Sequence, residues 1–194
     1  EWVSVSTVVC RAAPGLAVGL AAGVTVACQV GTLTEAISYD ELDLSSGIAG
    51  ALSNGTPAGG GRVVLLGVDS LGAHRFSVQV RVGGTAAEAT SWLSESEISC
   101  QLSAGAGMDL VVAMTVAWFQ GTLGGAVSYD KPYVHPGGQS GFLSNSRKVG
   151  GSKVMILGEN LGAASYSVAG RLGGTGCMRS DWTSDSSVVC KSPR

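Results

Sequence analysis

Few residues of this 194-residue sequence carry the chemistry of a catalytic, metal or cofactor site. Proton transfer in enzymes depends most often on a histidine held beside a second catalytic group. The two histidines, His74 and His135, fall in expected loops, and neither recurs where the chain repeats itself. We therefore predict no catalytic residue, no metal site and no cofactor, and we expect a protein that is not an enzyme.

One modification motif is present. Asn54-Gly55-Thr56 has the Asn-x-Ser/Thr pattern that accepts N-linked glycans, and it lies in an expected surface loop, directly before Pro57. The sequence thus predicts a glycan on Asn54. The alternative is that Asn54 and the surrounding serines and threonines hydrate the surface unaided.

A repeat of 90 residues organises the chain. Tryptophan and cysteine recur at this spacing, as Trp2, Trp92 and Trp182 and as Cys10, Cys100 and Cys190. Longer motifs return with them: Arg81–Thr85 as Arg171–Thr175, Ser38-Tyr39-Asp40 as Ser128-Tyr129-Asp130, and Gly60-Gly61 as Gly150-Gly151. This period is too long for a solenoid repeat, whose units need neighbours to bury a core, and it suits a small domain that folds alone.

The five cysteines are not equivalent within this repeat. Cys177 and Cys190 lie in one unit, whereas the position equivalent to Cys177 in the preceding unit is Ala87. We predict a disulfide between Cys177 and Cys190, which implies an oxidising compartment; a pair of buried thiols is the alternative. Cys28 is interpreted either as a buried small residue or as an irregular partner of Cys10.

The other recurring motifs have structural explanations. Gly83-Gly84-Thr85 and Gly173-Gly174-Thr175 lack the lysine and the following helix of a phosphate-binding loop, so they predict tight turns with positive backbone angles. The repeated tryptophans are expected to pack within each unit rather than to stack on sugars. Asp40-Glu41-Leu42-Asp43 contains calcium-binding residue types, but its counterpart contains Lys131 and Pro132, which favours a solvated turn.

Charge excludes two classes of partner. Charged residues are 13% of the chain and the net charge is −2, so there is no basic patch for nucleic acid and no charge run for a membrane surface. The uncharged run from Gly15 to Val30 is shorter than the roughly 20 residues that cross a bilayer. We interpret it as a strand with its turn, and we expect no membrane insertion by this segment.

Short alternating apolar stretches between glycine-rich turns predict an all-β chain of tandem Ig-like sandwiches. Arg62–Val68 and Phe76–Val82 are the clearest expected strands. The repeat assigns the C-terminal half of one unit to residues 1–40, a complete unit to residues 41–130 and the N-terminal part of a further unit to residues 131–194. The outer parts are completed either by continuation of one chain or by strands from neighbouring chains.

Several of these motifs together resemble the IPT/TIG class of Ig-like repeats. They are Gly-Gly before a strand, Gly-x-x-Leu-Gly after it, then Gly-Gly-Thr, Trp-x-Ser-x-Ser and a Val-Cys strand. The version with Ser-Tyr-Asp and Arg-x-Gly-Gly-Thr is similar to tandem arrays in secreted or cell-surface proteins of algae and other protists, including filament proteins of flagellar hairs (mastigonemes). This resemblance implies an extracellular or cell-surface protein, with O-linked sugar on loop hydroxyls and on Pro132 and Pro136.

The predicted function is a structural subunit of an extracellular glycosylated filament or cell-surface fibre, whose partners are copies of itself and covalent glycans. Short Ser-Tyr-Asp linkers would fix the angle between units, and a repeating angle generates a helical or extended fibre. The alternative is an adhesin or receptor ectodomain that binds glycans or proteins through the loops at 45–56 and 135–148. A noncatalytic module of a surface enzyme is a third interpretation.

Overall fold

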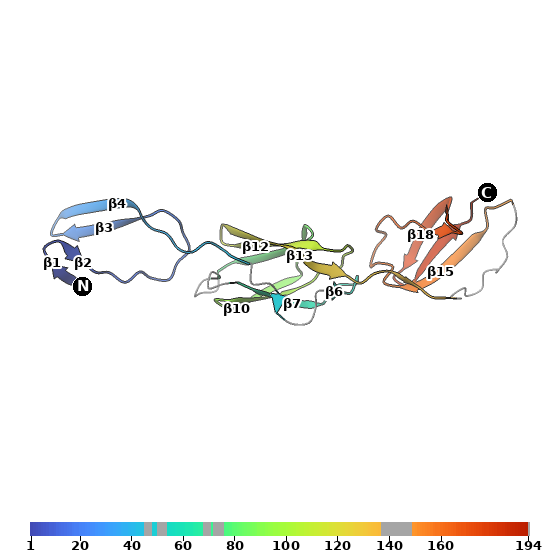
Figure 1. The fold of residues 1–194 in the computed structure, drawn as a ribbon, viewed down its shortest axis with the longest axis horizontal. Helices are drawn as coiled ribbons and strands as arrows, with labels where there is room; N and C mark the ends of the chain where they lie inside the picture. The colour runs from blue at the N-terminus through green and yellow to red at the C-terminus, as the bar shows by residue number, and fades with distance from the viewer. Residues whose placement is uncertain (45–47, 50–53, 68–70, 72–75, 137–148, 194) are drawn as a thin grey trace.

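The computed structural model describes residues 1–44, 48–49, 54–67, 71, 76–136 and 149–193. Across these ranges every regular element is a β-strand, which confirms the all-β prediction. The described residues contain no helix long and apolar enough to cross a membrane. The strands fall into three groups that follow one another along the long axis of the molecule, with the two ends of the chain far apart (Figure 1).

The middle group is a sandwich of two sheets (Figure 1). Among the described residues, one sheet has the strand order β10 (Ala89–Ser94), β11 (Glu97–Gln101), β7 (Arg62–Leu66) and β5 (Ile48–Ala49). The other has the order β6 (Asn54–Gly55), β13 (Phe119–Tyr129), β12 (Leu110–Val116), β8 (Val78–Val82) and β9 (Thr85–Ala86). Neighbouring strands are antiparallel, except that β6 runs parallel to β13.

Side chains from both sheets of this sandwich meet in one core. Alternate residues of a strand point to opposite faces, which is why β7 buries Val63 and Leu65 while β12 buries Val112, Met114 and Val116. The remaining buried residues are Val80, Val82, Ile98, Cys100, Leu102 and Val127, with Leu42, Leu44 and Leu71 from connecting segments. Burying each such side chain contributes about 1.5–3 kcal/mol, so this packing is the main stabilising term.

Residues 1–40 form two hairpins: β1 (Trp2–Ser4) with β2 (Thr7–Val8), and β3 (Leu20–Val26) with β4 (Gln29–Ile37). The β3–β4 ladder has the same register as the β12–β13 ladder. Leu20 lies opposite Ile37 as Leu110 lies opposite Val127, and both ladders shift register directly after this pair. The 90-residue repeat of the sequence is therefore also a repeat of the backbone.

Residues 131–136 and 149–193 contain a sheet with the order β14 (Tyr133–Val134), β15 (Lys153–Glu159), β19 (Ser187–Lys191) and β18 (Arg179–Ser184). A hairpin of β16 (Arg171–Leu172) and β17 (Thr175–Gly176) lies apart from it. β18, β19 and β15 correspond to β10, β11 and β7, and the hairpin corresponds to β8 and β9. Within this described segment no strand corresponds to β12 or β13.

The structure corrects the repeat by one residue at its glycine pair. The sequence pattern pairs Gly60-Gly61 with Gly150-Gly151, but Arg62 lies opposite Gln101 in the middle sheet, whereas Lys153 lies opposite Lys191 in the next. β7 and β15 are thus offset by 91 residues rather than 90. Backbone angles agree, because Gly59 and Gly60 have φ of 81° and 80°, and Gly150 and Gly151 have φ of 72° and 80°.

The two serines of each Trp-x-Ser-x-Ser motif close the turn that follows. The amide of the second serine donates to the hydroxyl of the first at 3.3 Å in all three copies, which are Ser4 and Ser6, Ser94 and Ser96, and Ser184 and Ser186. Such side-chain bonds to nearby amides stabilise tight turns. The recurring motif therefore specifies a hairpin turn.

The Ser-Tyr-Asp motif is part of the unit rather than a linker, so that prediction is wrong at Ser128 and Tyr129, which end strand β13. Ser128 Oγ accepts a hydrogen bond from the amide of Asp109 at 3.0 Å, and Tyr129 donates its hydroxyl to the carbonyl of Ser103 at 2.7 Å. Burial raises the pKa of Tyr129, so the hydroxyl stays a donor at neutral pH. The motif fastens the last strand to the loop before β12.

Candidate functional site

The histidines are not brought into a catalytic arrangement in the described part of the chain. His135 Nε2 lies 3.3 Å from Glu159 Oε1, with both side chains exposed, and its ring meets the ring of Tyr133 edge-on. His74 lies outside the described residues. Within the described ranges, no group of three or more His, Cys, Asp or Glu residues is placed to hold a metal ion.

Cys177 and Cys190 form a disulfide bond that joins the segment between β17 and β18 to β19, with their Cα atoms 5.7 Å apart. The bond depends on the glycine opposite it, because a Cβ on Gly170 would lie only 2.9 Å from Cys177 Sγ. The sulfur thus fills the space that a side chain at position 170 would need. Glycine at position 170, directly before β16, therefore leaves room for the disulfide.

The middle unit has different residues at the positions of Gly170 and Cys177. Val80, the counterpart of Gly170, is buried, and Ala87 stands in place of the first cysteine. The local backbone is the same, because the amide of Ala87 donates to Val80 as that of Cys177 donates to Gly170, each at 2.9 Å. Cys100 remains a buried free thiol, and desolvation raises its pKa to about 11. Its sulfur is therefore protonated and shielded at neutral pH.

Cys10 and Cys28 are free and exposed, so both sequence interpretations of Cys28 are wrong. Cys28 follows β3 and precedes β4, in a turn whose first residue, Ala27, has a φ of 53°. Its counterpart in the middle unit, Trp118, occupies the same turn and is also exposed. The tip of this hairpin points away from the core, and for this reason residue type alone did not indicate its position.

Asn54 of the glycosylation motif is exposed, but it lies in strand β6 rather than in the expected loop. β6 pairs with the end of β13 through Asn54 opposite Ser128. Thr56, the third residue of the motif, donates its hydroxyl to the carbonyl of Gly59 at 3.1 Å. The asparagine side chain is thus presented at the edge of a sheet, on a backbone held by a neighbouring strand.

The repeated tryptophans differ in exposure. Trp92 is half-buried against the core of the middle unit, and Trp182 is half-buried and donates its Nε1 proton to the carbonyl of Gly162 at 3.1 Å. These two positions fit the packing interpretation better than a sugar-stacking platform. Trp2, in contrast, is exposed.

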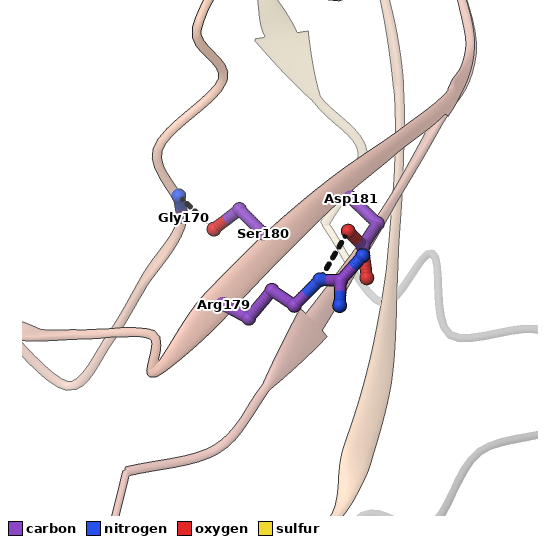
Figure 2. A network of polar contacts seen from close by, with 4 residues as sticks. All are labelled: Gly170, Arg179, Ser180 and Asp181. Carbon is purple, nitrogen blue, oxygen red and sulfur yellow. Dashed lines mark hydrogen bonds and ion pairs between the residues drawn. The ribbon is translucent and has the colours of Figure 1, made fainter.

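Polar contacts of β18 separate into an inner and an outer set (Figure 2). Ser180 accepts a hydrogen bond from the amide of Gly170 at 2.8 Å, which holds the glycine segment beside the strand. Arg179 and Asp181, on either side of it in sequence, form an exposed ion pair at 2.6 Å. Exposed pairs of this kind contribute about 0–1 kcal/mol, so the pair is no sign of a binding site.

The junction between the middle and C-terminal groups is short and held by hydrogen bonds. Three residues, 130–132, separate β13 from β14. The amide of Asp130 donates to the carbonyl of Gly55 at 2.8 Å, and Asn160 Nδ2 donates to the carbonyl of Lys131 at 3.4 Å. The connection is thus attached to the groups on both of its sides.

A hollow of about 540 Å³ lies beside this junction. Both groups contribute to it: Met108 and Tyr129 from the middle group, and Ile156, Val168 and Val188 from the C-terminal group. The wall is mainly apolar, and its titratable residues are Tyr129, Asp130, Lys131 and Tyr166. Its chemistry suits the burial of apolar side chains, as in the interior of a sandwich.

The loops on which the binding alternative depends, 45–56 and 135–148, lie largely outside the described residues. The described part of the first loop is Asn54 to Thr56, with Ile48 and Ala49 placed as a strand paired with β7. The described part of the second is His135 and Pro136.

A model of the IPT/TIG domain family matches residues 50–129 and 140–194, which together exceed half of the chain. No curated protein matches the chain. Two structures of the plexin A4 extracellular region match it, one with 15% identity and a TM-score of 0.41 over 84% of this chain, the other with 19% and 0.37 over 75%. The chain spans 14% and 15% of the lengths of these plexin chains.

Proposed function

Because this chain belongs to the IPT/TIG domain family, we propose that it is a structural segment of an extracellular fibre in which Ig-like units follow one another in series. The family provides the unit, a sandwich closed around its own core. We propose in addition that units joined in series are held at fixed intervals along the fibre. More specifically, we propose a filament like those of flagellar hairs (mastigonemes).

The observation that carries the proposal is the short junction. Tyr129 and Tyr133 belong to strands of successive groups, so three residues are all the backbone that joins them. A flexible linker would need a longer stretch with neither strand pairing nor side-chain contact. Hydrogen bonds from Asp130 and from Asn160 restrain this stretch at both ends. Successive units would therefore keep a fixed angle, which is what a fibre requires.

The surface chemistry supports an extracellular place for such a fibre. The Cys177–Cys190 disulfide is typical of oxidising compartments. The surface carries little charge, which reduces repulsion between neighbouring copies. We propose that Asn54, exposed at a sheet edge, carries an N-linked glycan. Sugar at this position would keep a weakly charged surface in solution.

The fixed junction is tested by inserting Gly-Ser-Gly-Ser between Asp130 and Lys131. The insertion should leave each group of strands folded but broaden the distribution of chain dimensions in small-angle X-ray scattering. The matched control places the same insertion between Gly83 and Gly84, an exposed turn inside one unit, and should not change the overall length. Equal scattering from the two variants would contradict a rigid junction.

The fibre itself is tested on native material by electron cryomicroscopy. A periodic fibre that repeats every one or two units, with extra density on Asn54, would support the proposal. Isolated particles without such a repeat would favour the adhesin or receptor ectodomain instead.

A further inference from the structure

Asn54 is followed by a glycine that the core of the middle unit requires. Gly55 is buried in strand β6, and a Cβ at this position would lie 2.6 Å from Leu102 Cδ1. Leu102 is itself fully buried, so a side chain at position 55 would have to displace part of the core. Because glycine has no Cβ, its backbone nitrogen approaches the side-chain amide of a preceding asparagine with the least obstruction. The fold therefore keeps a reactive pair at positions 54 and 55.

The pairing of β6 restrains this pair from reacting. Ring closure needs the nitrogen of Gly55 beside the side-chain amide carbon of Asn54, at a backbone angle ψ outside the extended region of a strand. β6 is held extended by its parallel pairing with the end of β13. The amide of Asp130 also donates to the carbonyl of Gly55 at 2.8 Å. A two-residue strand at the edge of the described sheet opens more readily than the core strands, and its opening frees the pair.

We propose that Asn54 is a site of deamidation and that opening of β6 from β13 controls its rate. In the open strand the Gly55 nitrogen gives its proton to solvent base and bonds to Cγ of Asn54. The bond from Cγ to Nδ2 then breaks, and ammonia leaves a cyclic imide. Water opens the imide either at Cγ, which gives aspartate, or at the main-chain carbonyl carbon, which gives isoaspartate. The reaction consumes water and releases ammonia, so it needs no other reactant.

The isoaspartate product does not restore the original pairing. Its main chain runs through the side-chain carbon, so the chain between positions 54 and 55 is longer by a methylene group. Strand pairing depends on a fixed spacing of residues, and the Gly55 carbonyl is therefore displaced from the amide of Asp130. This hydrogen bond attaches the junction to the middle group. Deamidation to isoaspartate thus loosens the junction at its first end.

Deamidation and N-glycosylation are alternative fates of Asn54. Both use Nδ2, which carries the glycan in one case and leaves as ammonia in the other. A chain with a glycan on Asn54 has no free amide nitrogen to lose, and the two deamidated products have no amide to glycosylate. The deamidation proposal rests on the geometry of β6 alone, and it depends neither on the glycan nor on the proposed fibre.

Incubation of the full 194-residue chain at mildly alkaline pH tests the site. The chain is made in a bacterial host that attaches no N-glycans. Peptide mass spectrometry follows the mass increase from amide to acid at Asn54, and a protein isoaspartyl methyltransferase detects the isoaspartate. Conversion should be at least about tenfold faster in urea than in the folded chain, because only a minor open population of β6 reacts. No conversion at Asn54 in urea, or equal rates in the two states, overturns the proposal.

A proline substitution tests the control by β6. Asp130→Pro removes the amide that donates to Gly55 and leaves the reactive pair unaltered. Conversion should rise about two- to tenfold, since loss of one backbone hydrogen bond shifts an opening equilibrium by this factor. Asp40→Pro, at the equivalent position of the preceding junction, should convert at the wild-type rate. Equal rates in the two variants overturn the control by β6, and the comparison of folded with unfolded wild type holds whether or not Asp130→Pro folds.

Hydrogen exchange at the amide of Asp130, measured by NMR, tests the effect on the junction. The purified isoaspartate chain is compared with Asn54→Asp, which has the same charge on an ordinary main chain. Exchange should be about two- to tenfold faster in the isoaspartate chain, because only there is the Gly55 carbonyl displaced. Equal exchange in the two chains overturns the loosening of the junction. All these samples lack a glycan and are studied as separate chains, so failure of the proposed function would not change their results.

Discussion

The disulfide of the C-terminal group should be transferable to the middle unit only as a pair of substitutions. Cys177 needs Gly170 beside it, since a Cβ there would lie 2.9 Å from the sulfur. In the middle unit the corresponding residues are Ala87 and the buried Val80. Ala87→Cys alone would press its sulfur against Val80, whereas Val80→Gly with Ala87→Cys reproduces the arrangement around Cys190 at Cys100.

The magnitudes follow from chain entropy and from burial. A bridge between positions 87 and 100 closes a loop as long as that between Cys177 and Cys190, which are 13 residues apart, and this stabilises by about 3 kcal/mol. Val80→Gly removes about 1.5–3 kcal/mol of burial and about 0.5–1 kcal/mol of strand stability. The oxidised double variant should therefore be about as stable as the wild type, and the reduced form about 3 kcal/mol less stable.

Amide hydrogen exchange of residues 97–101, in strand β11, measures the middle unit separately from the others. Exchange there should be about 100-fold slower in the oxidised than in the reduced double variant, because each 1.4 kcal/mol is a factor of ten. The same variant with Cys100→Ser should show no such difference. If Ala87→Cys alone oxidises as completely, with the same protection, then Val80 does not occupy the space and the reasoning is refuted.

Three further predictions concern single groups. Cys100 should resist alkylation at neutral pH, whereas Cys10 should react. The free energy of unfolding should fall as pH rises from 9.0 to about 11, because the Cys100 thiol loses its proton at lower pH in the unfolded chain than in the folded one. Urea unfolding measured against pH should show this fall in the wild type and not in Cys100→Val. Tyr129→Phe deletes one hydrogen bond to a backbone carbonyl and should lower the free energy of unfolding by about 1 kcal/mol in the same assay. In a secreting eukaryotic host Thr56→Ala should remove the glycan mass from Asn54 and Thr56→Ser should keep it; equal masses for these two variants would contradict glycosylation there.

The features that the sequence predicted are those with local causes. Gly83-Gly84 and Gly173-Gly174 have positive φ, between 56° and 85°, as expected for tight turns without side chains to oppose them. Strands such as Arg62–Leu66 follow from alternating apolar residues between turns. The family resemblance to IPT/TIG repeats, based on these recurring turns and strands, is also confirmed.

The features that it missed depend on partners distant in sequence. A run of three glycines at 59–61 can be aligned with Gly150-Gly151 in two ways, and only the ladder partners of Arg62 and Lys153 decide between them. Asn54 belongs to a strand of two residues that exists through its pairing with β13. Nothing in the local sequence around Asn54 indicates that pairing, so a loop was the expected assignment.

Exposure of strands β3 and β4 shows that distant partners also decide which faces are buried. Strands β3 and β12 have the same apolar alternation, so the sequence predicts the same inward face for both. That face is buried in β12, where β7 and β11 pack against it, and exposed in β3, where the counterparts of β10 and β11 are the short strands β1 and β2. An apolar alternation therefore specifies a strand and the need for a covering sheet, while the identity of the covering sheet comes from the fold.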